Sequence, residues 1–181
     1  TQSEDPVVMR LAPKLEANVA RAVTLAETTL SFGRASEPAP ILGQVDLTSL
    51  LQDVVETELM AIGQLPIDVR FEISENLIIR ADSEQLHRAL SNLVRNARQA
   101  LADQLKGGAI VLKAWQTPQF WIIDVIDTGP GLPEKAKAHL FKPFQGTVTG
   151  GGSGLGLAIV QELMRGHGGS AEYLKANGAG A

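Results

Sequence analysis

The sequence predicts an α+β fold in which helices cover one face of a mixed sheet. Amphipathic helical segments and short alternating strands are interleaved, without the regular strand–helix alternation of a parallel α/β fold. The chain has 181 residues, 44% of them hydrophobic, which is enough for one domain of ordinary size plus an appendage. It contains no run of about 18 apolar residues, so no membrane-spanning helix is expected.

The composition excludes several classes of function. The net charge is -4 and no basic stripe is present, so nucleic-acid binding has no electrostatic basis. The chain has no cysteine, which excludes disulfides and thiolate metal sites and fits a reducing compartment. We therefore expect this chain to make no contact with nucleic acid or with a membrane.

One long helix is expected first, from Val7 to Phe32, with apolar residues at alternating three- and four-residue spacing. Such a stripe needs a partner, which is either another helix or the globular core of the same chain. Prolines then make Ser36–Pro40 an extended connection. These observations divide the chain into a helical part (1–36), a linker (37–45) and a globular part (46–181).

The globular part alternates between helical and extended patterns. In chain order we first expect a helix capped by Asp46 from Leu47 to about Met60, then strands Ile67–Ile73 and Leu77–Ala81 with a turn at Asn76. A helix from Asp82 or Ser83 to about Leu105 and a hairpin of Ala109–Ala114 and Phe120–Ile126 should follow. The last expected elements are a short helix from Pro133, a glycine-led helix over Leu157–Met164 and a strand over Ser170–Lys175.

Two glycine-containing stretches mark a candidate nucleotide site. Asp127 ends a buried apolar strand, and Gly129 and Gly131 after it let the backbone turn and approach a ligand closely. The stretch Gly150–Leu157 then opens a helix, whose first N–H groups and positive dipole end suit an anion. A carboxylate pocket combined with a phosphate-binding helix start indicates a nucleotide.

Amide side chains on the long central helix form a second candidate feature. Asn92 and Asn96 lie one turn apart, with Gln99 at the next step along the same face. Amide oxygens can ligate Mg²⁺, a hard ion that prefers oxygen. Taken alone, the pair is explained equally well by a solvated helix face.

Five short motifs occur in a fixed order, namely Asn92–Ala97, Asp127–Gly131, Leu140–Phe144, Gly152–Leu157 and His167–Gly169. Together they resemble the N box, first glycine box, F box, second glycine box and final glycine pair of bacterial sensor histidine kinases. These kinases belong to the GHKL group with DNA gyrase B, Hsp90 and MutL. The resemblance covers about residues 46–177 and implies a Bergerat-type two-layer sandwich. It further implies that residues 1–36 hold the second helix of a dimerisation and phosphoacceptor hairpin, and that a last core strand is missing after residue 181.

The resemblance implies a role for each motif. Asp127 would accept a hydrogen bond from the adenine amine and so select ATP over GTP, while Gly129 and Gly131 would admit the purine. Asn96 would ligate Mg²⁺ between the phosphates, with help from Asn92. The remaining expected ATP-binding residues are Gln99, Lys142, Phe144, Gly152, Ser153, Gly154, Leu155, Gly156 and Leu157, and residues 144–153 would form a lid over the nucleotide.

The resemblance also implies a reaction. An amide at Asn92 cannot act as the base that a glutamate provides in the hydrolysing branches, so transfer of the γ-phosphoryl group to a histidine is expected, followed by relay to an aspartate of a response-regulator receiver domain. None of His87, His139 and His167 lies in the N-terminal helical stretch, so this chain is not expected to phosphorylate itself. The full-length parent is expected to be a homodimer through its helical hairpin, with this part in the cytoplasm whether or not the parent is anchored in a membrane.

The sequence departs from the family pattern in its cations. Gln99 stands where relatives often carry Lys or Arg, and residues 145–149 of the expected lid have no basic residue. Charge compensation would then fall to Arg95, Arg98 or Lys142. Two alternatives therefore stay open, a phosphotransfer adaptor that has lost its nucleotide and a hydrolysing GHKL ATPase.

Overall fold

The computed structural model describes residues 11, 12, 15, 19, 37–60, 66–102, 107–143 and 154–174, without the side chains of Leu59 and Lys135. The long helix predicted over Val7–Phe32 lies almost entirely outside the described residues. Among the helices that the structure describes, none combines the length and the apolar character needed to cross a bilayer.

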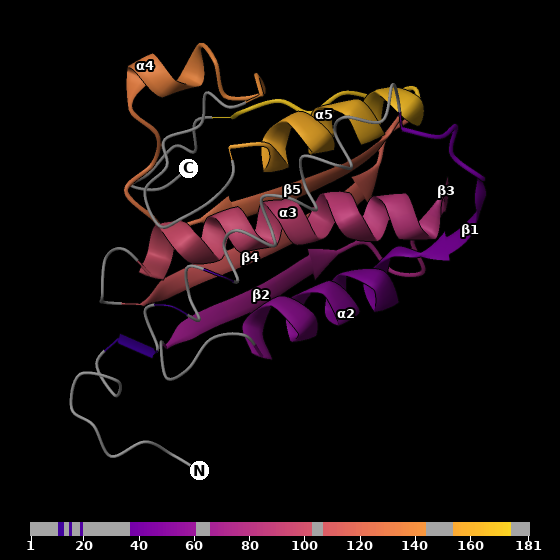
Figure 1. The fold of residues 1–181 in the computed structure, drawn as a ribbon. Helices are drawn as coiled ribbons and strands as arrows, with labels where there is room; N and C mark the ends of the chain where they lie inside the picture. The colour runs from indigo at the N-terminus through magenta and orange to yellow at the C-terminus, as the bar shows by residue number, and fades with distance from the viewer. Residues whose placement is uncertain are drawn as a thin grey trace.

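The described chain forms a three-stranded mixed sheet covered on one face by helices (Figure 1), which confirms the predicted fold class. Strand β4 (Gly108–Gln116) is central, pairing in parallel with β2 (Ile67–Ile73) and antiparallel with β5 (Trp121–Asp127). The helices on this face are α2 (Leu47–Met60), α3 (Ser83–Ala102) and α5 (Gly156–Gly166). A short helix, α4 (Glu134–Lys137), follows Pro133 as predicted.

A separate two-stranded antiparallel sheet joins β1 (Gly43–Asp46) to β3 (Ile78–Ala81). Strand β1 was not predicted from the sequence, and its first three residues lie in the segment 37–45 that was assigned to the linker. A turn was also predicted between strands Ile67–Ile73 and Leu77–Ala81, whereas these two strands belong to different sheets. Asn76 does adopt a left-handed conformation between them, with φ 53°, as a turn asparagine can.

Helix α2 begins where the sequence predicted. The Asp46 carboxylate accepts hydrogen bonds from the backbone N–H of Thr48 (3.0 Å) and from the hydroxyl of Ser49 (3.0 Å). A cap of this kind contributes about 1 kcal/mol. Because Asp46 also ends β1, one residue closes the strand and starts the helix.

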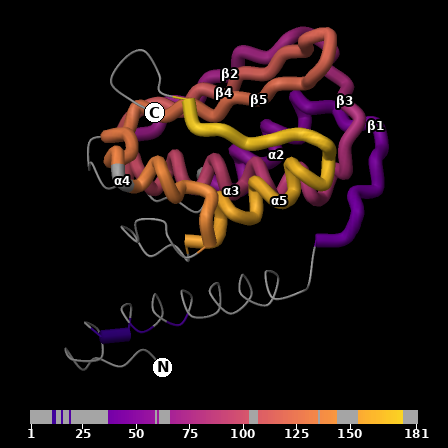
Figure 2. The backbone as a smooth tube through the Cα atoms, turned by 90° about the horizontal axis from the view of Figure 1, so that it is seen from above, coloured from indigo at the N-terminus to yellow at the C-terminus, as the bar shows by residue number. Residues whose placement is uncertain are grey.

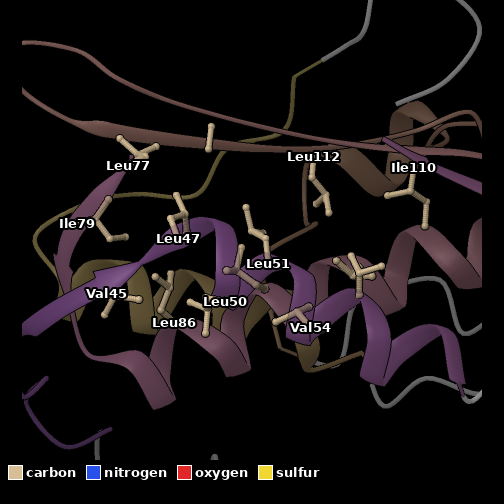
Figure 3. Close-up of a cluster of buried hydrophobic side chains, with 14 of the residues drawn as sticks. Val45, Leu47, Leu50, Leu51, Val54, Leu77, Ile79, Leu86, Ile110 and Leu112 are labelled. Carbon is tan, nitrogen blue, oxygen red and sulfur yellow. The ribbon is translucent and has the colours of Figure 1, made fainter. Parts of the chain in front are cut away.

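The main core lies between the three-stranded sheet and the helices α2 and α3. Figure 3 shows its leucine, isoleucine and valine side chains from several elements pointing toward one another. We call the following buried residues the main core: Val45, Leu47, Leu50, Leu51, Val54, Val55, Leu77, Ile79, Ala81, Leu86, Leu90, Val94, Ala97, Leu101, Ile110, Leu112 and Ala114.

Helix α5 packs against α3 through a second and smaller cluster. This α5 cluster consists of the buried residues Ala89, Leu155, Ile159, Val160 and Leu163. After α5 the chain turns back toward α4 (Figure 2), where the Lys137 ammonium lies over the Tyr173 ring. The predicted last strand is not formed in its described part, because Ser170–Leu174 adopts no regular structure.

Candidate nucleotide-binding site

The loop after β5 brings the Asp127 carboxylate to the helix-covered side of the sheet. Asp127 lies opposite Ile110 in the β4–β5 ladder, and residues opposite one another share a sheet face. Ile110 is fully buried in the main core. Asp127 therefore faces the helical layer, whereas Asp124, opposite Lys113, faces away from it.

A short hydrogen bond holds the Asp127 side chain against its own turn. The backbone N–H of Gly129 donates to Asp127 Oδ1 at 2.7 Å. Partial burial raises the pKa of Asp127, and the bond from Gly129 offsets part of that effect. The carboxylate is thus partly desolvated and fixed in direction, as recognition of a hydrogen-bond donor requires.

The turn packs tightly on helix α3 at Gly129. A Cβ atom at this position would lie 2.5 Å from Asp127 Oδ1 and 3.1 Å from the Cβ of Ala100. No side chain larger than hydrogen fits there without moving the carboxylate. Gly131 adopts φ +68°, a conformation that glycine accepts without strain.

The other end of the site lies where α5 begins. A Cβ atom at Gly156 would lie 3.0 Å from Asn92 Oδ1, so the start of α5 faces the amide of α3 directly. The Asn92 Nδ2 group donates to the Arg88 carbonyl at 2.9 Å, which turns Oδ1 toward α5. Leu155 at the N-cap position has no side-chain oxygen with which to cap the helix. The first turn of α5 is therefore suited to an anion.

Helix α3 connects these two ends. Asn92, Asn96 and Ala100 follow one another at four-residue spacing, so they lie on one face of the helix. From Asn92 to Ala100 the helix rises by about 12 Å at 1.5 Å per residue. The face thus runs from the anion-binding end to the carboxylate, with Asn96 halfway, and its length suits a nucleoside triphosphate.

The structure brings together only part of the predicted set. Asp127 and Gly129 pack together at one end of this face of α3, Asn92 and Gly156 meet at the other end, and Gly154 adopts φ +69° just before α5. Asn96, Gln99 and Leu157 are half-buried, Leu155 is buried in the α5 cluster, and Lys142 is exposed. Phe144, Gly152 and Ser153 lie outside the described residues.

Two of the cations proposed for charge compensation are engaged elsewhere. Arg95 makes a double contact with Glu58 of α2, at 2.6 Å from Nη2 and 3.2 Å from Nε. Arg98 Nη2 lies 3.9 Å from the same carboxylate. The Glu58 side chain is only 6% exposed, so it holds both guanidinium groups near α2 rather than at the start of α5. This pairing was not predictable from the sequence, because Glu58 is 37 residues from Arg95.

Residue Thr128 contributes to the site in a way that the sequence analysis missed. Its hydroxyl oxygen accepts a hydrogen bond from the Ala109 N–H at 2.9 Å, and its own N–H donates to the Ala109 carbonyl at 3.1 Å. These two bonds tie the Asp127 turn to the start of β4. The turn is therefore built into the sheet and is not a loose loop.

Comparisons with known proteins show the family of the chain. Residues 81–181 match the family described as Histidine kinase-, DNA gyrase B-, and HSP90-like ATPase. The chain is 33% identical over 146 residues to the nitrogen regulation protein NtrY of Azorhizobium caulinodans, covering 78% of this chain and 18% of that protein. It thus spans less than a fifth of the length of this relative.

Solved structures show the same fold. Full-length ShkA in complex with AMPPNP superposes with a TM-score of 0.75 at 28% identity, covering 92% of this chain and 35% of ShkA. The histidine kinase ThkA in complex with the response regulator protein TrrA gives a TM-score of 0.77 at 24% identity, covering 98% of this chain and 50% of that one. At 24% identity, the similarity to ThkA shows a shared fold alone.

The family match extends over more than half of the chain and includes Asn92, Asn96, Asp127 and the glycine-led helix. The chain therefore belongs to the family of histidine kinase-, DNA gyrase B- and HSP90-like ATPases, as a catalytic domain of the sensor histidine kinase type.

Proposed function

We propose that this chain binds Mg-ATP and supplies its γ-phosphoryl group to a histidine of the parent kinase, for relay to an aspartate of a response regulator. One observation carries the proposal. Asn92 contacts the start of α5, and it lies on the same face of α3 that packs against the Asp127 turn. Support for the partner comes from ThkA, which was solved with a response regulator protein.

Asp127 would select the base. An ionised carboxylate only accepts hydrogen bonds, so it pairs with the exocyclic amine of adenine and repels the carbonyl oxygen of guanine. Its direction is already fixed by the Gly129 N–H. Because Gly129 has no Cβ, no side-chain atom of this residue displaces the carboxylate from the position where it would meet the base.

The other end of the site would hold the phosphates. The start of α5 offers N–H groups and a positive dipole end directly beside the amide of Asn92. The amide oxygens of Asn92 and Asn96 form a donor set that fits Mg²⁺, and the ion would neutralise phosphate charge when bound. This charge neutralisation matters here because Glu58 engages Arg95 and Arg98.

The amide at Asn92 favours transfer over hydrolysis. An amide nitrogen has no basic lone pair, so it cannot take a proton from an attacking water. The domain would instead position the γ-phosphoryl group for an incoming imidazole, with the bond to ADP breaking as a phosphorus–nitrogen bond forms. Steady release of inorganic phosphate from ATP would favour the hydrolysing alternative.

Calorimetric titration with AMPPNP, with and without Mg²⁺, tests the proposal. We expect magnesium-dependent binding that GTP does not displace. Asp127→Asn should weaken binding about tenfold or more, since it removes the charge from one hydrogen bond. Asn can still accept the Gly129 N–H, so the fold should persist.

The matched control is Asp124→Asn, which makes the same change three residues away on the opposite face of β5. It should leave the affinity unchanged. If wild-type protein does not bind AMPPNP at millimolar concentration, the nucleotide-free adaptor becomes the better description. Equal losses in both variants would contradict the adenine role of Asp127.

A further inference from the structure

The segment just before β1 docks on the first half of helix α3. Glu37 forms a paired contact with the Arg88 guanidinium, 2.9 Å from Nη1 and 2.8 Å from Nη2. The Gln85 amide donates to the Pro38 carbonyl at 2.9 Å. The Glu37 side chain is only 14% exposed and Gln85 is buried, so these contacts are more than surface ion pairing.

The same segment also reaches helix α5. The Glu37 N–H donates to Glu162 Oε1 at 3.2 Å. Pro40 lies beside the end of the helix, 3.6 Å from the position that a Cβ at Gly166 would take. Two residues of the segment thus touch α5, while Glu37 and Pro38 also hold α3.

A third connection closes the arrangement at the start of α3. The Ile41 N–H donates to Asp82 Oδ2 at 2.8 Å, and the Asp82 N–H donates to His167 Nε2 at 3.0 Å. His167 Nδ1 lies 2.8 Å from the Leu163 carbonyl, so this nitrogen carries the proton and Nε2 accepts. The linker, the start of α3 and the end of α5 are therefore joined by a continuous set of hydrogen bonds.

These contacts share a helix face with the nucleotide site. Asp82, just before α3, and Gln85, Arg88, Asn92 and Asn96 within it follow one another at three- and four-residue spacing. The first three hold the linker, and Asn92 contacts the start of α5. Arg88 belongs to both groups, because its carbonyl accepts the Asn92 amide while its guanidinium holds Glu37.

Two kinds of contact hold α5 against α3. One is the α5 cluster, against which the partly buried Leu93, Met164 and Ala171 also pack. The other is the set of linker contacts at the far end of α5. The distance between α5 and Asn92 depends on both. A nucleotide that contacts Asn92 and the start of α5 together needs that same distance.

We propose that docking of residues 37–42 on α3 and α5 is thermodynamically coupled to nucleotide binding between Asn92 and the start of α5. The inference rests on the proposed function, since the ligand is the same nucleotide. Both events stabilise one spacing of the two helices, so each must favour the other by an equal factor. A change in the residues before position 37 that alters this docking would therefore alter nucleotide affinity without any contact with the nucleotide.

The test combines calorimetry with residue-specific amide exchange on the whole chain. Saturating AMPPNP should slow exchange of the Glu37 and Ile41 amides, which donate to Glu162 and Asp82. Glu37→Gln should weaken AMPPNP binding about fivefold, the lower end of typical coupling. Glu162→Ala, which removes the acceptor of the Glu37 N–H, should act in the same direction.

Asp68→Asn is the matched control, because it removes one carboxylate charge from the exposed Arg70–Asp68 pair on β2. It should leave both affinity and exchange unchanged. Wild-type affinity in both linker variants, or exchange at Glu37 and Ile41 that ignores AMPPNP, would overturn the coupling while leaving the proposed function intact. Failure of the wild-type protein to bind AMPPNP would instead overturn both.

Discussion

The two faces of helix α3 pack in different ways. One face joins the sheet and α2 through the main core, which has seventeen buried residues among those described. The other meets α5 through the α5 cluster, which has five, together with polar contacts of the linker. The candidate site lies on this second face. The part of the domain next to the candidate site thus has the smaller apolar cluster, and regions with less buried apolar contact are expected to open more readily.

Truncating one leucine in the main core and one in the α5 cluster should show this difference most strongly. Leu112→Ala in β4 should cost about 3–5 kcal/mol of unfolding free energy, because a fully buried leucine leaves a cavity in a large core. Leu163→Ala in α5 should cost only about 2 kcal/mol, since the small cluster can give way locally. Denaturant unfolding measures both values.

Amide exchange separates the two outcomes further. In Leu163→Ala, protection should fall in α5 while β4 keeps most of its protection. In Leu112→Ala, both elements should lose protection together. Equal loss in α5 and β4 for Leu163→Ala would mean that the two faces of α3 form one cooperative unit.

A methyl group added at the start of α5 should disturb the site more than the fold. Gly156→Ala places a Cβ 3.0 Å from Asn92 Oδ1. We expect AMPPNP affinity to fall by up to about tenfold, the equivalent of one hydrogen bond. The free energy of unfolding should change by less than about 1 kcal/mol, because alanine favours the helix.

Gly166→Ala is the control for this change, at the other end of the same helix. Its Cβ would make an ordinary contact with Pro40 at 3.6 Å. Affinity should therefore stay within about twofold of wild type, less than one typical hydrogen bond. A similar loss in both variants would point to a general effect on α5 and away from the contact with Asn92.

The smallest expected effects are in the pH dependence of stability, where two aspartates act in opposite directions. Backbone hydrogen bonds from Gln85 and then Ile41 lower the pKa of Asp82, although burial opposes this. Its stabilising contribution is therefore present above pH 3.8 and is lost as the pH falls below that value. Burial raises the pKa of Asp127, so its charge costs stability at neutral pH.

Thermal unfolding of two variants across this pH range checks both signs. Asp82→Asn should be less stable than wild type at neutral pH, with the difference vanishing in acid. Asp127→Asn should be more stable than wild type at neutral pH, and its advantage should shrink as the pH falls toward 3.8. The same direction of change in both variants would contradict the structural assignment of the two carboxylates.

Sequence patterns were sufficient for the elements that depend on local periodicity. Helices α2, α3 and α5 and strands β2, β4 and β5 occur where their apolar spacing predicted, because each buries one stripe or one face. The position of Asp127 at the end of a strand was also predictable, while its role toward adenine stays a prediction. The order of motifs along the chain then identified the family.

Pairings between distant segments were not predictable in the same way. Strand β1 has only four residues, and its partner β3 lies more than thirty residues away. The engagement of Arg95 by Glu58 and of Arg88 by Glu37 spans 37 and 51 residues. No local pattern specifies such contacts, because each depends on how segments distant in the sequence pack against one another. The carboxylate with which each of these arginines pairs was therefore known only from the structure.

The lack of a side chain at Gly129 has an evolutionary consequence. An alanine there would displace the Asp127 carboxylate, since the two would lie 2.5 Å apart, while the main core would be untouched. A glycine codon becomes an alanine codon by one base change. A folded variant of this domain with a displaced Asp127 carboxylate is thus a single mutation away, and under the proposed function it would keep the other motifs while losing its recognition of adenine.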